Sequence, residues 1–521
     1  MKLNRTFLFT SSLLSGIFLL AAGTLFNGCK SKPTQAYELT GDTIADGKAL
    51  VQLHCTKCHS LVPVNALTKT VWTVHSLPAM SQFLGISTYG TDYYKADKDT
   101  AGLSLLEWQS IVTYYKKMAP DTLMPAKAPS PLLNDWAGFS IIKPAKVNDI
   151  CFTTMVASSP NTGKLYTGDV VSGYMTGWTR DLKESGQTKL PSAAVNAEFV
   201  KDSTGAEQAI ISCIGRLDPV DFPNGRIYNV ALGSKNQQPT EVASDLPRPV
   251  QTLNADFDKD GSNEIIVLGQ GHLRGGIFLL KPTTDHKSYK QFTISSRAGA
   301  VQAVTGDFNK DGWLDLMVLF GENNEGLALL LNDHKGGFTS KDLLNFPPTN
   351  GSTSFQLADM DHDGKLDLIY TCGYNFRDSR ILKPYHGLYI FKNLGDFKFK
   401  QTLFYPINGC TKAIATDFDK DGDLDIATIA FFADMKSKPA EEFIYFEQDK
   451  PMNFKAHAVP VSQNGRWLSM EVTDHDGDGK PDIILGNYAA GFLFQPNFTP
   501  NWDEHTPFII LQNNTGNKHY R

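Results

Sequence analysis

The sequence predicts a multidomain protein in which a small all-α domain is followed by an all-β propeller of about seven four-stranded blades. Two observations carry this prediction. An acidic pattern recurs five times, at intervals of 51 to 58 residues, among short β-rich runs, and fixed recurrence at such a period is typical of stacked or radial repeats. Ahead of the repeats, between residues 41 and 124, apolar residues follow helical spacing instead.

The size and charge of the chain narrow its class. Its 521 residues are enough for several separate cores. The net charge at pH 7 is −6, and no long run of lysine or arginine occurs, so we expect no nucleic-acid partner. No serine–histidine–aspartate set or dinucleotide-binding loop stands out, and no catalytic residue is assigned.

The first residues have the layout of a secretory signal. Two basic residues precede an apolar stretch from Phe7 to Phe26. The stretch ends at Gly28-Cys29 and resembles a bacterial lipoprotein signal. The resemblance implies a signal peptide over residues 1–28, a lipid on Cys29, a tether over residues 29–40, and an exported chain anchored to a membrane in the periplasm or at the cell surface. An uncleaved single-helix anchor is the alternative, because the run is long enough to span a bilayer.

The stretch DTIADGKALVQLHCTKCHSLV begins with an amphipathic helical pattern and ends in a C-x-x-C-H motif. In such a motif, Cys55 and Cys58 form thioethers with the two vinyl groups of a haem, and His59 binds the iron from the same turn; it is the attachment signal for c-type haem. A zinc site would need a second ligand pair at similar spacing. A redox-active C-x-x-C would need a β-α-β context. Because the sequence has neither, we expect one covalent haem.

The sixth iron ligand has four candidates: Met80, Met118, Met124 and His75. The segment resembles class I cytochromes c, in which a helix, the C-x-x-C-H motif, a methionine loop and a final aromatic-bearing helix follow one another. Here the final helix is expected in SLLEWQSIVTYYKKM. The resemblance implies a cytochrome c domain over residues 41–124 with Met80 as the axial ligand, because Met80 precedes that helix. Met124 follows the helix and is the alternative.

The remaining chain divides into a linker and a repeat region. Residues 125–140 are rich in proline and small residues, which suits a semi-rigid linker. From residue 141 to residue 521, each clear unit reads as strand A, acidic loop, strand B, variable loop, strand C, turn and strand D. Four antiparallel strands repeated radially form a β-propeller. Five clear units and two weaker ones, VASSPNTGKLYTGDV and NAEFVKDSTGAEQAIISC, predict seven blades, with six and eight as alternatives.

The acidic loops have the ligand pattern of a calcium site. In TDFDKDGDLDIAT, Asp417, Asp419, Asp421 and Asp425 occupy positions one, three, five and nine, and Gly422 at position six permits a sharp turn. Four gathered carboxylates repel one another unless a cation lies between them. Solvated acidic turns would not need regular spacing, and paired-carboxylate catalysis would need one special site rather than five similar copies. We therefore expect structural calcium.

These units resemble the FG-GAP or VCBS repeat, whose D-x-D-x-D-G-x-x-D loop binds calcium between two strands of a blade. The resemblance covers residues 250–490 well and residues 141–250 poorly. It implies about five calcium ions, with one asparagine and one glutamate among the oxygen ligands. The implied ligands are Asp256, Asp258, Asp260 and Glu264; Asp307, Asn309, Asp311 and Asp315; Asp359, Asp361, Asp363 and Asp367; Asp417, Asp419, Asp421 and Asp425; and Asp474, Asp476, Asp478 and Asp482.

The loops between strands B and C emerge together on one face of the predicted propeller. They span residues 269–276, 372–387 and 432–442, and functional residues often lie on such loops. We expect this face to dock a glycan, a small molecule or a redox partner protein. The expected rim residues are Arg248, His272, Arg274, Tyr374, Arg377, Arg380, His386, Arg466 and Trp467.

The expected function is membrane-tethered electron transfer by the haem, with the propeller as a docking platform for an unknown redox partner. One alternative is a periplasmic haem-dependent oxidoreductase whose propeller binds the substrate. Another is a carbohydrate-binding or adhesion protein with an accessory haem. Four remaining cysteines form disulfides in an oxidising compartment or are buried as small apolar residues, and their pairing stays open: Cys151, Cys213, Cys372 and Cys410.

Overall fold

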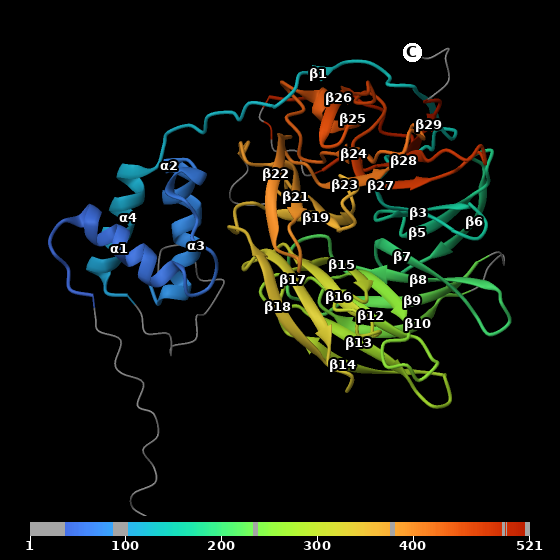
Figure 1. The fold of residues 1–521 in the computed structure, drawn as a ribbon, viewed down its shortest axis with the longest axis horizontal. Helices are drawn as coiled ribbons and strands as arrows, with labels where there is room; N and C mark the ends of the chain where they lie inside the picture. The colour runs from blue at the N-terminus through green and yellow to red at the C-terminus, as the bar shows by residue number, and fades with distance from the viewer. Residues whose placement is uncertain are drawn as a thin grey trace, which may run out of the picture.

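The structure is a computed structural model that describes residues 37–86, 103–232, 238–375, 381–491, 495 and 497–515. The expected signal peptide, the expected lipidation site Cys29, and the rim residues Arg377 and Arg380 lie outside the described residues. A helical region comes first, and a ring of seven β-sheets follows it (Figure 1). Among the residues described, no helix is both long and apolar enough to cross a lipid bilayer.

The helical region contains α1 (Thr43–Cys55), α2 (Lys69–Val71), α3 (Leu77–Ser81) and α4 (Leu105–Met118), with a π-helical turn at Trp72–Ser76 and 3₁₀ turns at Val64–Ala66 and Gln82–Leu84. α1 begins where it does because the carboxylate of Asp42 accepts the backbone N–H of Ile44 and of Ala45. α4 begins with a reciprocal capping box between Ser104 and Glu107. The final helix expected from the sequence is therefore confirmed.

Helices α1 and α4 cross closely at Gly47. A Cβ atom at this position would lie 2.3 Å from the carbonyl oxygen of Ser110 and 2.6 Å from Cβ of Tyr114, so only glycine allows this approach. Around the crossing lies a small core that includes Leu50 and Ile111, both without exposed surface. The two helices thus form the frame that holds the C-x-x-C-H segment at the end of α1.

Seven four-stranded blades confirm the propeller and its blade number. In the first three blades the strands follow one another in chain order. Blade 1 contains β3 (Thr153–Ser158), β4 (Leu165–Asp169), β5 (Tyr174–Trp178) and β6 (Glu184–Lys189). Blade 2 contains β7 (Ala194–Lys201), β8 (Glu207–Cys213), β9 (Gly225–Ala231) and β10 (Thr240–Leu246). Blade 3 contains β11 (Pro249–Ala255), β12 (Glu264–Gly269), β13 (Gly276–Pro282) and β14 (Tyr289–Ser295).

The next three blades follow the same antiparallel order. Blade 4 contains β15 (Ala300–Gly306), β16 (Asp315–Phe320), β17 (Gly326–Asn332) and β18 (Phe338–Asn345). Blade 5 contains β19 (Ser352–Ala358), β20 (Asp367–Cys372), β21 (Gly387–Asn393) and β22 (Phe399–Pro406). Blade 6 contains β23 (Lys412–Thr416), β24 (Asp425–Ile429), β25 (Phe443–Lys450) and β26 (Asn453–Ala458).

Blade 7 closes the ring with a strand that precedes blade 1 in the sequence. It contains β27 (Trp467–Thr473), β28 (Asp482–Asn487), β29 (Phe508–Asn513) and, as its outermost strand, β2 (Phe139–Ile142). Phe139 pairs with Asn513 and Ile142 with Ile510. The sequence pattern predicted only consecutive units, and it did not reveal this closure because the pairing joins segments that are far apart in the chain.

The expected linker is partly strand. Besides β2, it contributes β1 (Leu132–Leu133), which pairs in parallel with β26 at the outer edge of blade 6. Nearby, the linker residue Asp135 accepts a hydrogen bond of 2.8 Å from Nδ1 of His457. The chain between the helical region and the propeller is therefore held on blade 6 rather than free along its whole length.

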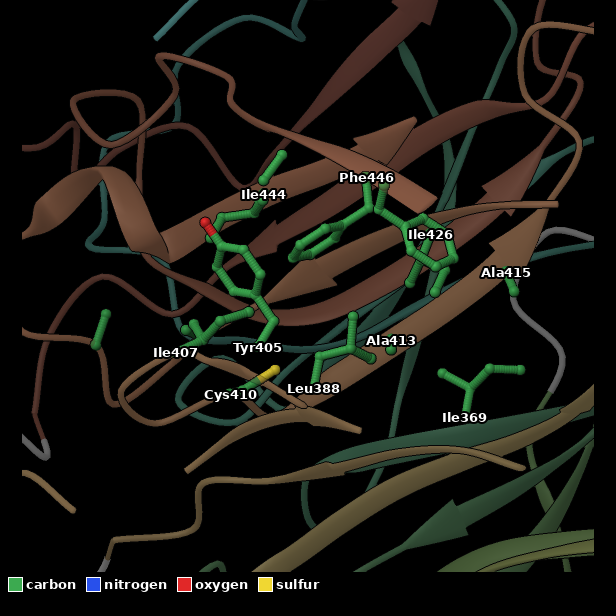
Figure 2. Close-up of a cluster of buried hydrophobic side chains, with 14 of the residues drawn as sticks. Ile369, Leu388, Tyr405, Ile407, Cys410, Ala413, Ala415, Ile426, Ile444 and Phe446 are labelled. Carbon is green, nitrogen blue, oxygen red and sulfur yellow. The ribbon is translucent and has the colours of Figure 1, made fainter. Parts of the chain in front are cut away.

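The cores lie between neighbouring blades. Figure 2 shows one of them, where Leu388 and Tyr405 of blade 5 face Ile444 and Phe446 of blade 6. Near the axis, strand A side chains join consecutive blades. The amide of Gln356 exchanges two hydrogen bonds with the backbone of Ala415, at 2.7 and 2.9 Å. Such contacts fix the angle between blades and hence the position of each acidic loop.

Candidate metal and cofactor sites

The five acidic loops connect strands A and B in blades 3 to 7, at the end of each blade opposite to the loops between strands B and C. In four of these loops, three carboxylates each offer an oxygen within 4.8 Å of the others. The convergent sets are Asp256, Asp258 and Asp260; Asp359, Asp361 and Asp367; Asp417, Asp419 and Asp425; and Asp474, Asp476 and Asp482.

The remaining predicted ligands lie in the same loops but outside those sets. They are Glu264 in blade 3, Asp363 in blade 5, Asp421 in blade 6, Asp478 in blade 7, and the four residues of blade 4. In blade 4, Asn309 takes the place of an aspartate and donates to Asp311 at 2.8 Å. Nε2 of His334 lies 2.9 Å from the same carboxylate of Asp311.

Local hydrogen bonds give the loops one shared shape. The first aspartate of each loop accepts the backbone N–H of the glycine at position six, as Asp417 does from Gly422 at 3.2 Å. That glycine is left-handed in all five loops, with φ of 101° at Gly422, which explains why glycine is required there. The conformation of the loop backbone therefore orients the carboxylates toward one point even without a bound ion.

The ninth residue of each loop begins strand B and is buried. Asp425 has no exposed surface, and its two oxygens accept the backbone N–H of Phe418 and of Gln448 at 3.1 and 2.8 Å. Burial raises the pKa of Asp425 to about 7 and that of Asp482 to about 6. Burial of these carboxylates in their charged form costs free energy of folding unless a cation or a proton neutralises them.

Several buried loop oxygens have no hydrogen-bond partner: Oδ1 of Asp256, Oε1 of Glu264 and Oδ1 of Asp361. Buried polar atoms in folded proteins are rarely left unsatisfied. Hard oxygen donors on a flexible loop are the ligands that calcium takes. The loops therefore fit a divalent cation both in their donor chemistry and in their unsatisfied atoms.

The haem-attachment residues lie at the end of α1. Cys55 is its last residue, Cys58 is exposed, and His59 is half-buried. Nδ1 of His59 lies 2.8 Å from the carbonyl oxygen of Ser60, so Nδ1 carries the proton and Nε2 is the nitrogen left for a metal. Burial raises the pKa of the Cys55 thiol to about 11.

The candidates for the sixth ligand lie in different places. Met80 is in α3 and is 38% exposed, and His75 is in the π-helical turn. Met118 ends α4, and Met124 follows it with 79% of its surface exposed. The helical region also exposes apolar side chains, and covering them would be favourable because it removes apolar surface from water. They are Leu53, Val74, Met80, Phe83, Leu105 and Leu106.

Four of the expected rim residues are buried, which corrects their expected role. Trp467 has no exposed surface, and Arg248, His386 and Arg466 are at most 5% exposed. Arg466 donates to the carbonyl oxygens of Phe431 and Gly491. Arg248 likewise donates to the carbonyl oxygens of Gly271 and Leu217, so the two arginines join loops to one another. Because all four side chains are buried, they do not present a ring or a charge to a ligand.

The other described rim residues remain nearer the surface. Arg274 is exposed, and Tyr374 is half-buried with its ring 5.8 Å from that of Phe432. His272 lies 3.2 Å from a carboxylate oxygen of Glu322. The four cysteines whose pairing stayed open are all buried free thiols: Cys151, Cys213, Cys372 and Cys410.

One contact between the helical region and the propeller had no signal in the sequence. Ile381 and Tyr385, from the loop between β20 and β21, pack against the core of the helical region. This loop belongs to the face on which a partner was expected. Its described part therefore contacts the helical region of the same chain.

Residues 256–318 and 307–370 match the FG-GAP-like repeat family. No curated protein matches the chain. Among solved structures, the chain is similar to virginiamycin B lyase from Staphylococcus aureus, with 11% identity over 72% of this chain and 99% of that one and a TM-score of 0.44. For the Pan2 WD40 domain of Neurospora crassa the values are 10%, 74%, 98% and 0.44. For the biofilm matrix protein Bap1 of V. cholerae they are 10%, 76%, 92% and 0.36.

Structural similarities with identities and TM-scores this low do not indicate the function of this chain. The family match is more specific, because its two segments contain the acidic loops that open at Asp256, Asp307 and Asp359. Together with the seven sheets, it establishes that the chain contains FG-GAP-like repeats within a seven-bladed β-propeller.

Proposed function

We propose that the protein is an exported c-type cytochrome that transfers electrons through one covalent haem, with a calcium-stabilised propeller as its docking platform. The observation that carries this proposal is the C-x-x-C-H segment at the end of α1, with Cys58 exposed and with His59 held through Nδ1. This motif is the attachment signal for c-type haem.

The residues of the helical region fit a haem. Cys55 and Cys58 would hold it through thioethers, and His59 would be one axial ligand. Met80 would be the other, with Met124 as the alternative. A bound haem supplies a one-electron couple, and a methionine ligand raises its potential relative to a second histidine. The Nδ1 contact of His59 fixes the orientation of its ring, and the exposed apolar side chains would exclude water.

The propeller would bind about five calcium ions. The cations would neutralise the acidic loops and stiffen the junction between strands A and B, and they would do no chemistry. The donor set of each loop and the unpartnered oxygens of Asp256, Glu264 and Asp361 support this role.

The contact between the helical region and the propeller supports the docking role. Tyr385 and Ile381 hold the helical region against the propeller, and β1 fixes the linker on blade 6. Such a platform would present the helical region to a redox partner in a fixed orientation. Export and a lipid on Cys29 complete the proposal, since haem attachment of this type follows secretion.

The test is expression in a host that matures c-type cytochromes, followed by visible spectroscopy and mass spectrometry of the purified chain. We expect one haem per chain, bound covalently, and a reversible one-electron couple. A Cys55→Ala, Cys58→Ala variant should carry no covalent haem and still bind calcium. A wild-type chain without porphyrin mass on these thiols would overturn the cytochrome proposal. Haem reduction by a defined small molecule, without another enzyme, would instead indicate an oxidoreductase.

A further inference from the structure

One position on strand C lies opposite the ninth loop residue in every blade that has an acidic loop. In blade 6, for example, the pairing of Ile426 with Phe446 places Glu447 opposite Asp425. The same register in the other blades selects residues of different charge. In blades 3 to 7 this position holds Lys281, Leu331, Lys392, Glu447 and Gln512.

In blades 3 and 5, the residue at this position places an ammonium group among the loop carboxylates. Nζ of Lys281 forms ion pairs with Asp258 and with Asp260, the latter at 3.4 Å. Nζ of Lys392 does the same with Asp361 and with Asp363, the latter at 3.2 Å. A cation from the chain thus contacts the carboxylates that are the predicted ligands of calcium.

Blade 5 carries a second ammonium group. Nζ of Lys365, at position seven of the loop, lies 2.9 Å from Oδ2 of Asp363. Two lysines therefore contact one loop of four carboxylates. No other of the five described loops has ion pairs with two lysines.

In blade 6 the equivalent residue is acidic. Glu447 adds a carboxylate to the five aspartates of this loop, and its oxygens lie 3.8 Å from Nζ of Lys455 and 3.4 Å from Nε2 of His457. Lys455 is shared with Asp449 at 3.5 Å. Lys455 and His457 form their ion pairs with Glu447, Asp449 and Asp135 and not with the described carboxylates of the loop.

Blades 4 and 7 have neutral residues at this position. Leu331 has no polar atom to offer. Gln512 donates a hydrogen bond from Nε2 to Oδ2 of Asp476 at 2.6 Å. The position therefore varies from basic through neutral to acidic, while the predicted ligands beside it differ only at Asn309 and Glu264.

We propose that this strand C residue sets the calcium affinity of its own loop, so that blade 6 binds calcium most tightly and blades 3 and 5 most weakly. The inference rests on the proposed role of calcium. Lysine competes with the ion for the same carboxylates, and glutamate adds to the field that attracts it. The interaction of unit charges a few ångströms apart is strong enough to change an affinity by about tenfold or more.

The test is calcium titration of the full mature chain by isothermal calorimetry, with calcium-dependent hydrogen exchange of each loop as the site-resolved readout. We expect the loop of blade 6 to become protected at the lowest calcium concentration and that of blade 5 at the highest. Lys281→Met and Lys392→Met should each raise the affinity of their own loop about tenfold or more. Glu447→Gln should lower that of blade 6. Lys341→Met, at an exposed position of the outer strand β18 opposite Leu329, is the matched control and should change nothing.

The outcomes separate the inference from the proposal on which it rests. Five loops of equal affinity, or lysine variants that titrate like wild type, would overturn the inference and leave structural calcium intact. A wild-type chain that binds no calcium would overturn both. Lysine variants that gain calcium affinity in their own loops alone would establish the inference, because a general change in stability would shift the calcium dependence of all five loops together.

Discussion

The hydroxyl of Tyr385 donates a hydrogen bond of 3.0 Å to the carbonyl oxygen of Ala66, across 319 residues of chain. This bond joins the loop between β20 and β21 to the 3₁₀ turn that follows the C-x-x-C-H segment. Ile381 packs against the same helical core. The orientation of the helical region therefore depends on a few side chains of blade 5 in addition to the covalent linker.

Removing this hydrogen bond should loosen the helical region without unfolding it. Tyr385→Phe keeps the ring and loses one hydrogen bond, which is worth about 1 kcal/mol. We expect the chain between α4 and β1 to be cleaved about fivefold faster by a limiting amount of protease. Tyr289→Phe, on the outer strand of blade 3, is the control. Equal cleavage rates in Tyr385→Phe and wild type would show that the contact does not hold the module.

A side chain at Gly47 should separate α1 from α4. In Gly47→Ala the new Cβ would meet the carbonyl oxygen of Ser110 at 2.3 Å, and such overpacking costs about 1–3 kcal/mol. The helical region should therefore unfold at lower denaturant than in wild type, while the transition of the propeller stays in place. Lys48→Ala, on the exposed side of α1, serves as control. An unchanged first transition would contradict the close crossing.

Sequence reasoning reached the features that depend on local spacing. The acidic loops could be predicted because all their ligands lie within nine consecutive residues, such as Asp417–Asp425. Helix α4 could be predicted from the period of its apolar residues and from its N-terminal cap. The closure by β2 and the residues opposite the ninth position depend on pairing between distant segments, which no local pattern reports. Arg466 and Trp467 looked like surface residues for the same reason, since the neighbouring loops that bury them are remote in sequence.

Because β2 closes the ring, we expect its residue Phe139, which lies outside the repeats, to contribute strongly to the stability of the propeller. Phe139 is 2% exposed, and its ring packs edge-on against Tyr445 at 5.1 Å and Phe418 at 6.1 Å. Phe139→Ala should destabilise the propeller by about 3–5 kcal/mol, seen as a lower thermal midpoint. Trp136→Ala, three residues earlier and 42% exposed, should have little effect. Equal midpoints for the two variants would argue against closure by β2.

The identity of the sixth ligand predicts a difference between two methionine variants. Met80→Ala should lose the iron–methionine charge-transfer band at the red end of the visible spectrum and lower the reduction potential, because a methionine ligand raises it. Met124→Ala should keep both. The reverse pattern would assign the ligand to Met124, and loss in neither would exclude both. Covalent haem content, measured in parallel, separates a ligand effect from a failure of haem attachment.

Calcium removal should destabilise the propeller, and more so at high pH than at low pH. A site occupied at a hundredfold excess over its dissociation constant contributes about 2.7 kcal/mol, so chelation should lower the thermal midpoint at pH 8. Asp425→Asn removes one buried charge and should reduce the effect of chelation. Glu504→Gln, in a connection without an acidic loop, is a control for a general change of charge.

The pH dependence follows from the buried carboxylates. The pKa of Asp425 is raised to about 7 and that of Asp482 to about 6 in the folded chain, from an ordinary value of 3.8. Without calcium, folding therefore takes up protons between pH 4 and 7, and the chelated protein gains stability as the pH falls from 8 toward 5. Calcium replaces those protons, so the loaded protein should gain less. The difference in midpoint between loaded and chelated protein should shrink as the pH falls. A difference that stays constant from pH 8 to pH 5 would show that these carboxylates do not meet the ion.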